Sequence, residues 1–207
     1  MRPLQNRVTP MGEIIATSAR GTLMGNRGCL HDGAQRVVKS FQRKAWITCV
    51  LSFKGRKRTL MSPGQYTELF FLDEATALAA GHRPCAECSR ARYTEFLKAW
   101  RSGNPDLAVG DKFRSSDLDE CLHRDRLDEA GNKRLYASKL DSLPDSIFIR
   151  WPLQDSKGTA LVTGDTISLW SPKGHGPPQR RPQGIAVEVV TPRSIVKALA
   201  AGYRPFR

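Results

Sequence analysis

The sequence predicts an α+β fold with mostly antiparallel sheets, flanking helices and a small zinc knuckle. Three observations indicate this class. Short runs rich in β-branched and aromatic residues recur between turn-forming residues, and other segments carry apolar residues at helical spacing. A Cys-x-x-Cys pair also follows a helix stop, at the spacing used by zinc knuckles.

Two regions are expected along the chain. With 207 residues, 40% of them hydrophobic, the chain can bury one substantial core or two small ones. We place the boundary at 104–110, where a proline lies near flanking glycines. The expected regions are a basic zinc-binding region with a β-hairpin at 1–104 and an α+β region with four short strands and a C-terminal helix at 105–207.

The first region is expected to contain several short strands. After an irregular lead at 1–12, the composition predicts strands at 13–17, 21–24, 45–53 and 67–71. The segment 35–44 fits either a helix or a strand. A turn at 54–55 precedes three basic residues, and this pattern predicts a hairpin whose flank is formed by Arg56, Lys57 and Arg58.

The remaining elements follow from helical spacing and turn signals. The apolar spacing over 89–100 predicts an amphipathic helix, and Ser116 is expected to cap a second helix. Thr191 and Pro192 suit the start of a final helix. The four strands of this region are expected at 147–151, 160–163, 166–170 and 185–190, with a loop at 171–184 between the last two.

A short helix before the cysteine pair has clear boundaries. Asp73 can cap its start, and Gly81 suits the left-handed residue that ends it. The same stop recurs at 198–205 without cysteines, so only the copy with Cys85 and Cys88 is given a chemical role. We expect these two thiolates to bind zinc, and the alternatives are a redox dithiol or two ordinary thiols.

Two further ligands are needed to complete a tetrahedral site. Cys29 and His31 lie in an extended, glycine-rich segment, where residues two apart point the same way. The expected ligand set is therefore Cys29, His31, Cys85 and Cys88, closed around structural Zn²⁺. The alternative is that Cys29 is a loop thiol and His31 serves a substrate.

Two other candidate ligands are given different assignments. His82 precedes the cysteine pair and is an alternative donor to zinc. Cys49 shares a strand face with Ile47, Leu51 and Phe53, so we expect it to be a core thiol.

A half-motif of about 20 residues surrounds the cysteine pair. Its matching positions are Phe70, Phe71, Glu74, Ala75, Ala80, Gly81, Arg83, Pro84, Cys85 and Cys88. This half-motif resembles the Ada-type zinc-binding module of alkylation-repair proteins, similar versions of which are appended to some thermonuclease-like nucleases. The family's upstream Cys-Arg-Pro-x-Cys run, which supplies its other two ligands and its methyl acceptor, is absent here. The resemblance therefore implies a zinc knuckle that associates with DNA, without carrying over methyl transfer.

The net charge of +13 is unevenly distributed. Residues 1–60 carry +10 and residues 171–207 carry +6, while the middle of the chain is acidic or neutral. This asymmetry indicates a polyanionic partner, and we prefer nucleic acid, DNA first, over anionic lipid. The expected phosphate contacts are Arg20, Asn26, Arg27, Arg56, Lys57, Arg58, Arg83, Arg180 and Arg181.

Catalysis is left open by the sequence. His31 and His123 are the candidate acid/base residues, and Asp125 is the carboxylate nearest to His123 in sequence. If the protein is an enzyme, we expect a nuclease or a DNA glycosylase. The alternative for the segment around His123 is an ordinary solvated helix face.

The expected function combines these observations. Five cysteines without a signal peptide predict a reducing compartment, so we expect a cytoplasmic protein, nucleoid-associated if bacterial, with no membrane partner. We expect a zinc-stabilised DNA-binding protein that acts in DNA repair or processing. The alternatives are the nuclease or glycosylase and an RNA- or ribosome-associated protein.

Overall fold

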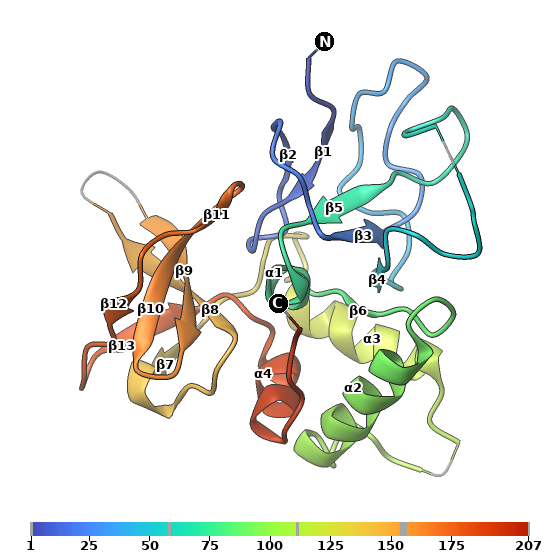
Figure 1. Ribbon diagram of the computed structural model, residues 1–207. Helices are drawn as coiled ribbons and strands as arrows, with labels where there is room; N and C mark the ends of the chain where they lie inside the picture. Colours follow the sequence, from blue (N-terminus) through green and yellow to red (C-terminus); the bar gives the residue numbers. More distant parts are fainter. Residues whose placement is uncertain (1, 58, 111, 154–156, 207) are drawn as a thin grey trace.

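The described residues form two mostly antiparallel sheets and four α-helices, which confirms the α+β class. The computed structural model describes residues 2–57, 59–110, 112–153 and 157–206 (Figure 1). The first sheet has the order β2-β1-β5-β3-β4-β6. Its strands are β1 (Gln5–Val8), β2 (Ile14–Ala16), β3 (Leu23–Asn26), β4 (Ile47–Cys49), β5 (Leu69–Phe71) and β6 (Arg83–Pro84).

The second sheet is built from the C-terminal part of the chain. It has the order β11-β10-β9-β8-β13-β7, and β12 pairs with β10. All of its recorded pairings are antiparallel. The strands are β7 (Tyr136–Lys139), β8 (Ile147–Pro152), β9 (Lys157–Thr163), β10 (Thr166–Ser171), β11 (Gly174–His175), β12 (Gln179–Arg180) and β13 (Ala186–Val189).

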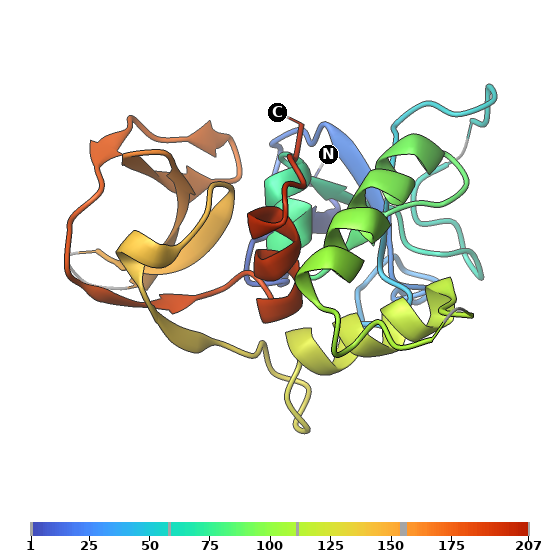
Figure 2. The same ribbon diagram turned by 90° about the horizontal axis from the view of Figure 1, so that it is seen from below.

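The helices join the two sheets into one molecule. They are α1 (Glu74–Ala79), α2 (Arg90–Gly103), α3 (Ser115–Arg126) and α4 (Arg193–Ala200). α1 contacts both β5 and β8, so it lies between the sheets, and α4 packs against α2 and α3 (Figures 1 and 2). No helix in the described part of the chain is both long enough and apolar enough to cross a membrane.

The boundaries of α1 follow the predicted signals. The side chain of Asp73 accepts a hydrogen bond from the backbone N–H of Thr76 at 2.7 Å, as expected of an N-cap. Gly81 has a φ of 91°, and a Cβ placed there would lie 2.5 Å from Cδ of Arg126. Both the left-handed backbone and the packing therefore require glycine at this position.

The largest hydrophobic cluster joins residues from both expected regions. Phe96 and Trp100 on α2 are fully buried with Ile149 on β8 and with Ile195 and Leu199 on α4. Smaller clusters lie within the first sheet and between α1 and the second sheet. The division at residue 104 stays a prediction, and the main core spans it.

Several predicted elements differ from the structure. The expected irregular lead contains β1, which pairs with both β2 and β5. The described residues between 50 and 68 form no strand, so the expected basic hairpin is wrong, and β4 pairs with β3 and β6 instead. The segment 35–44 is neither helix nor strand apart from an isolated bridge between Val37 and His31. α3 begins at Ser115, and its N-cap is Arg114 rather than Ser116.

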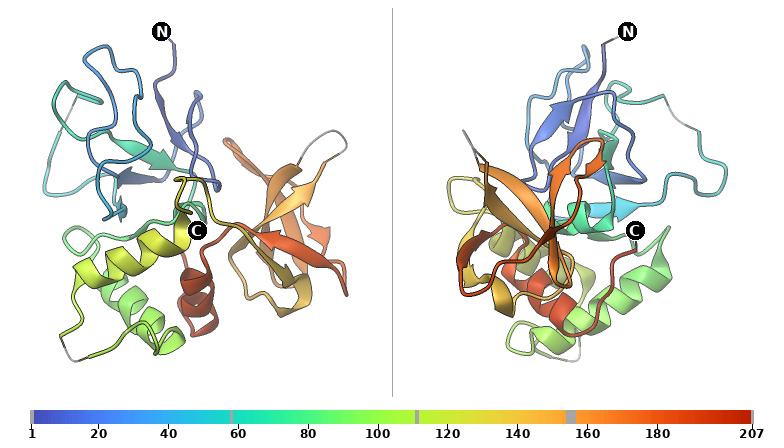
Figure 3. Two further views of the ribbon diagram at one scale, coloured as in Figure 1. Left: turned by 180° about the vertical axis from the view of Figure 1, so that it is seen from behind. Right: turned by 60° about the vertical axis from the view of Figure 1, so that its left-hand side comes forward.

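Long irregular connections therefore dominate one side of the first sheet. Viewed from behind, the connections that follow β3 and β4 extend away from the second sheet (Figure 3). Short strands joined by such connections leave the sheet dependent on contacts made by the loops. The cysteine pair directly follows β6, which is the last strand in the order of this sheet and lies next to β4.

Candidate metal centre

The pairing of β4 with β6 brings distant cysteines together. The two strands are parallel, with Thr48 opposite Pro84. The backbone N–H of Cys85 continues this pairing by donating to the carbonyl of Thr48 at 2.9 Å. Cys49 is therefore placed next to Cys85 by backbone geometry alone.

The helix start after the pair supplies the third sulfur. The N–H of Ser89 donates to the carbonyl of Cys85 at 3.2 Å, which folds the intervening turn back on itself. As a result, the sulfurs of Cys49, Cys85 and Cys88 all lie within 4.8 Å of one another. Sulfurs bound to one tetrahedral zinc lie roughly 3.8 Å apart for Zn–S bonds of about 2.3 Å. The three cysteines thus form a group that could hold a metal ion.

Backbone and side-chain hydrogen bonds favour a thiolate within this cluster. The N–H of Glu87 donates to Sγ of Cys85 at 3.4 Å, and the N–H of Val50 donates to the sulfur of Cys88. A hydrogen bond from the Cys49 thiol lowers the pKa of Cys85 to about 5. The same contact, followed by burial, raises the pKa of Cys49, and burial raises the pKa of Cys88. Thiolates are the form that binds metal.

The three cysteines line a cavity of ≈ 430 Å³ beside the first sheet, which we call the metal-site cavity. Two arginines, Arg43 and Arg56, line it together with the polar side chains of Asn26, Tyr66 and Glu68. Its apolar lining includes Ile47, Leu51, Phe53 and Phe70. Among the described residues the cluster has three Cys, His, Asp or Glu members, so a four-coordinate ion would keep one position for a group in this cavity.

Cys29 and His31 are not members of the cluster, and here the structure revises the predicted ligand set. Sγ of Cys29 lies 3.7 Å from the carbonyl of His31, whose ring nitrogens lie 2.6 Å from Oγ1 of Thr67 and 3.1 Å from the carbonyl of Ser62. His31 is buried with both nitrogens engaged, because the loop that carries it folds onto the connection before β5. This bonding assigns the ring a role in holding loops together.

His82 is also directed away from the cluster. Its ring is fully buried between Trp46 and Phe71, with ring centroids 5.2 and 4.6 Å away. Burial, followed by the charges of Arg27 and Arg126, holds its pKa well below the usual range, so the ring is neutral. His82 is therefore a core residue.

Two of the expected nucleic-acid contacts are buried. Arg27 is 1% exposed and Arg83 is 5% exposed. Arg83 donates to both carboxylate oxygens of Asp119 at 2.8 and 2.7 Å, which fixes α3 against β6. Burial raises the pKa of Asp119, and the hydrogen bonds from Arg83 act in the opposite direction. Neither arginine lies on the exposed surface.

The other expected contacts vary in their accessibility. Arg20, Arg56, Lys57 and Arg180 are exposed. Arg181 is partly buried, and its guanidinium donates to the carbonyls of Leu140 and Leu143. Asn26 faces the metal-site cavity, and Arg58 lies outside the described residues.

The second acid/base candidate lies on α3. Nδ1 of His123 accepts a hydrogen bond from Arg126 at 2.9 Å, while Asp125 accepts one from the backbone N–H of Ser194 at 2.6 Å. Asp125 thus holds the start of α4 and is not paired with the imidazole. The His123–Asp125 arrangement expected from the sequence is replaced by two separate structural contacts.

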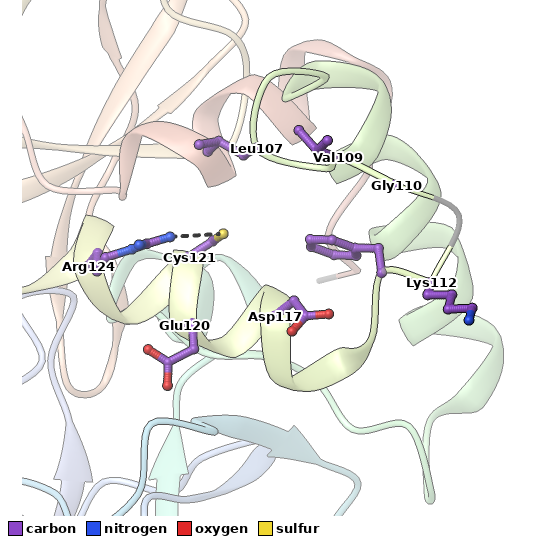
Figure 4. A pocket seen from close by; sticks show the side chains of 9 residues that line it. Leu107, Val109, Gly110, Lys112, Asp117, Glu120, Cys121 and Arg124 are labelled. Carbon is purple, nitrogen blue, oxygen red and sulfur yellow. Dashed lines mark hydrogen bonds between the residues drawn. The ribbon is translucent and has the colours of Figure 1, made fainter.

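A cavity of ≈ 680 Å³ lies along the same helix (Figure 4). Its side chains are of mixed charge, with Asp117 and Glu120 near Lys112 and Arg124. The guanidinium of Arg124 is directed at Sγ of Cys121, 3.6 Å away. Because the charges are mixed and no group of metal-binding side chains among the described residues converges there, the cavity indicates no particular chemistry.

Cys49 and Glu68 are the site residues that sequence reasoning missed. Cys49 was expected on the same face as Ile47, Leu51 and Phe53, and all four do line one cavity. The error lay in treating that shared face as the core. Glu68 directly precedes β5, is 2% exposed and accepts a hydrogen bond from the N–H of Met61, and no motif indicates it.

In comparisons with known proteins, no family model, no curated protein and no solved structure matches the chain. The resemblance to the Ada-type module therefore remains an expectation.

Proposed function

We propose that the protein is a zinc-thiolate protein that binds nucleic acid, DNA first, through phosphate contacts, and that it acts in DNA repair or processing. The observation that carries this proposal is the convergence of Cys49, Cys85 and Cys88 beside a loop that bears exposed basic residues. Three thiolates are a donor set that suits zinc, and the excess positive charge suits a polyanion.

The metal would organise the basic loop through the turn between its own ligands. Glu87 lies between Cys85 and Cys88, and its carboxylate lies 2.9 Å from the guanidinium of Arg56. When the turn is fixed, Glu87 holds the loop after β4 near the cavity mouth. Arg56 and Lys57 are then presented from a defined position, which reduces the entropy lost when a ligand binds.

Binding to polynucleotides at a series of salt concentrations tests the proposal. We expect fluorescence anisotropy with duplex DNA to show affinity that falls steeply with salt, because phosphate contacts release counterions. The Arg56→Ala and Lys57→Ala variants are each expected to reduce the slope of log affinity against log salt by about 1. Arg36→Ala, which removes an exposed arginine paired with Asp32, is the matched control.

Three outcomes are informative in this experiment. Equal slopes for Arg56→Ala, Lys57→Ala and Arg36→Ala would argue against the loop as the contact site. Tighter binding of RNA at matched salt would favour the RNA-associated alternative. The absence of binding to any polynucleotide at low salt would contradict the proposal.

A second candidate function is metal-dependent cleavage of a nucleic acid or removal of a base. It is favoured by the three-ligand cluster, because catalytic zinc sites keep one position open. Zinc held there would supply an activated water. Glu68 lines the same cavity and is the carboxylate that we propose for proton transfer.

Replacement of Glu68 separates this candidate from simple binding. Glu68→Gln is expected to retain zinc and nucleic-acid affinity while lowering any cleavage or base release by about 100-fold or more, the scale of a lost general acid or base. Denaturing gels with duplex, single-stranded, abasic and alkylated DNA, alongside RNA, give the measurement. Glu129→Gln, an exposed change outside the lining of this cavity, is the control. If the wild-type protein leaves every substrate intact, the binding function stands alone.

A further inference from the structure

A cluster of cationic side chains lies around Trp46, at a cavity that shares no lining residue with the metal-site cavity. Arg27 follows β3, Arg126 ends α3, and Lys133 lies in the segment that precedes β7. The guanidinium carbons of Arg27 and Arg126 both lie 3.9 Å from the ring centroid of Trp46. The two arginines are 1% and 0% exposed, so their charges are withdrawn from water.

Among the described residues, the hydrogen-bond acceptors of these three cations are neutral, and none of them is a carboxylate. Arg27 donates to the ring of His82 and to the carbonyls of Gly12 and Ser40, and its Nη2 is buried with no partner. Lys133 donates to the carbonyl of Ala79.

Arg126 is bonded in the same way. Its guanidinium donates to the carbonyls of Gly81 and Lys44 and to the ring of His123. Within the described part of the chain, none of the three cations forms an ion pair. The nearest carboxylates are committed elsewhere, since Asp119 binds Arg83 and Asp125 holds the start of α4.

Buried positive charge without a counterion is costly to the fold. Burial, followed by the charge of Arg126, lowers the pKa of Arg27 well below its usual value. Burial, followed by the charges of Arg126 and Arg27, lowers the pKa of Lys133 to about 7. Burial also lowers the pKa of Arg126 to about 9. An anion held among these groups would offset their repulsion and their desolvation.

The structure provides a space for such an anion. A cavity of ≈ 400 Å³ is lined by Arg27 and Lys133 together with Gly12, Ser40 and Trp46. Asn132 adds a neutral polar side chain. The carboxylate in the lining is that of Glu13, which is exposed, so solvent screens it more than it screens the buried arginine.

We propose that this cavity binds a phosphate group, with Arg27 and Lys133 as its cationic partners and Arg126 adding to the field behind them. A guanidinium can donate two parallel hydrogen bonds to a phosphate, and an ammonium supplies a point charge. The phosphate comes either from a free small molecule or from the end of a nucleic-acid chain. None of the three cysteines lines this cavity.

Calorimetric titration of the full-length protein with inorganic phosphate tests the proposal. We expect one site per chain and a rise in melting temperature with phosphate, each absent with chloride at the same ionic strength. Lys133→Met keeps the apolar stem and removes the charge, and it is expected to weaken phosphate binding by at least about tenfold. Lys139→Met, an exposed change on β7, should bind as the wild type does.

A stability measurement separates this role from a purely structural one. Without phosphate, Lys133→Met should melt at or above the wild-type temperature, because an uncompensated buried charge is removed. A structural role for the ammonium would instead lower the melting temperature and leave phosphate binding unchanged. That result, or equal responses of the wild type to phosphate and chloride, would overturn the proposal.

Matched oligonucleotides identify the source of the phosphate. If the site takes the end of a strand, a 5′-phosphorylated oligonucleotide should bind more tightly than its 5′-hydroxyl counterpart, and inorganic phosphate should compete. If it takes a small molecule, a nucleoside monophosphate or inorganic phosphate should bind while the two oligonucleotides remain equal. Both results require the site. Lys133→Met should abolish the preference for the 5′-phosphorylated oligonucleotide in the first case and weaken the binding of the small phosphate in the second.

Discussion

Replacing Cys49 with serine is expected to remove bound metal as effectively as replacing Cys85 or Cys88. All three sulfurs lie within 4.8 Å of one another, so the loss of any one leaves two thiolates. Affinity for zinc should fall by at least about 100-fold. Removing a group that only hydrogen-bonds to a metal ligand already costs up to about 100-fold, and here a direct ligand is removed. Elemental analysis and competition with a chromogenic chelator measure the stoichiometry and the affinity.

Cys29→Ser is the matched control for this experiment. Cys29 is partly exposed, and its sulfur is directed at the carbonyl of His31 rather than at the cluster. The variant should therefore bind zinc as the wild type does. Metal loss in Cys29→Ser together with retention in Cys49→Ser would restore the ligand set expected from the sequence.

Replacing Asp119 with alanine is expected to cost about 3–5 kcal/mol of unfolding free energy, because it leaves the buried charge of Arg83 without its partner. The pair is bidentate, and the two residues are 5% and 6% exposed. Urea unfolding followed by circular dichroism should show a large fall in midpoint with little change in slope. Loss of the pair would also release α3 from β6, next to Cys85.

The neighbouring acidic residue provides the control. Glu120 on the same helix forms an exposed ion pair with Lys44, and exposed pairs contribute little to stability. Glu120→Ala should therefore unfold close to the wild type. If Asp119→Ala were as mild, the buried pair would be replaceable, and the expected contact of Arg83 with nucleic acid would again become plausible.

Local signals in the sequence predicted part of this structure well. The cap at Asp73 and the stop at Gly81 depend on residues within one turn, so each was readable without tertiary information. In the described part of the second sheet, β8, β9, β10 and β13 were found near their true positions, because alternation and turn residues act over a few positions. β7 was not predicted, and neither were β11 and β12, which are two-residue strands within the segment expected to be a loop. The long strand expected at 45–53 shortened to three residues, since its β-branched composition says nothing of where pairing ends.

The candidate site was less accessible to sequence reasoning. The Cys-x-x-Cys pair is a local motif, whereas its third member comes from a parallel pairing between distant segments. Alternation correctly grouped Cys49 with Ile47, Leu51 and Phe53, but it does not reveal whether a shared face meets a core or a cavity. In the same way, an arginine in the sequence shows that a positive charge is present but not whether its side chain is buried. Arg27 and Arg83 were for that reason predicted to contact nucleic acid, whereas both are buried.

The parallel pairing of β4 with β6 has a consequence for handling the protein. β6 is the edge strand next to β4. It has two residues, so few backbone hydrogen bonds hold it in the sheet. Thiolates on both sides of this junction would secure it through the metal. Withdrawal of the ion would let β6 detach and uncover the amide and carbonyl groups along the outer margin of β4. Exposed strand edges of this kind pair with strands of other molecules. Removal of the metal by a chelator should therefore promote self-association of the protein.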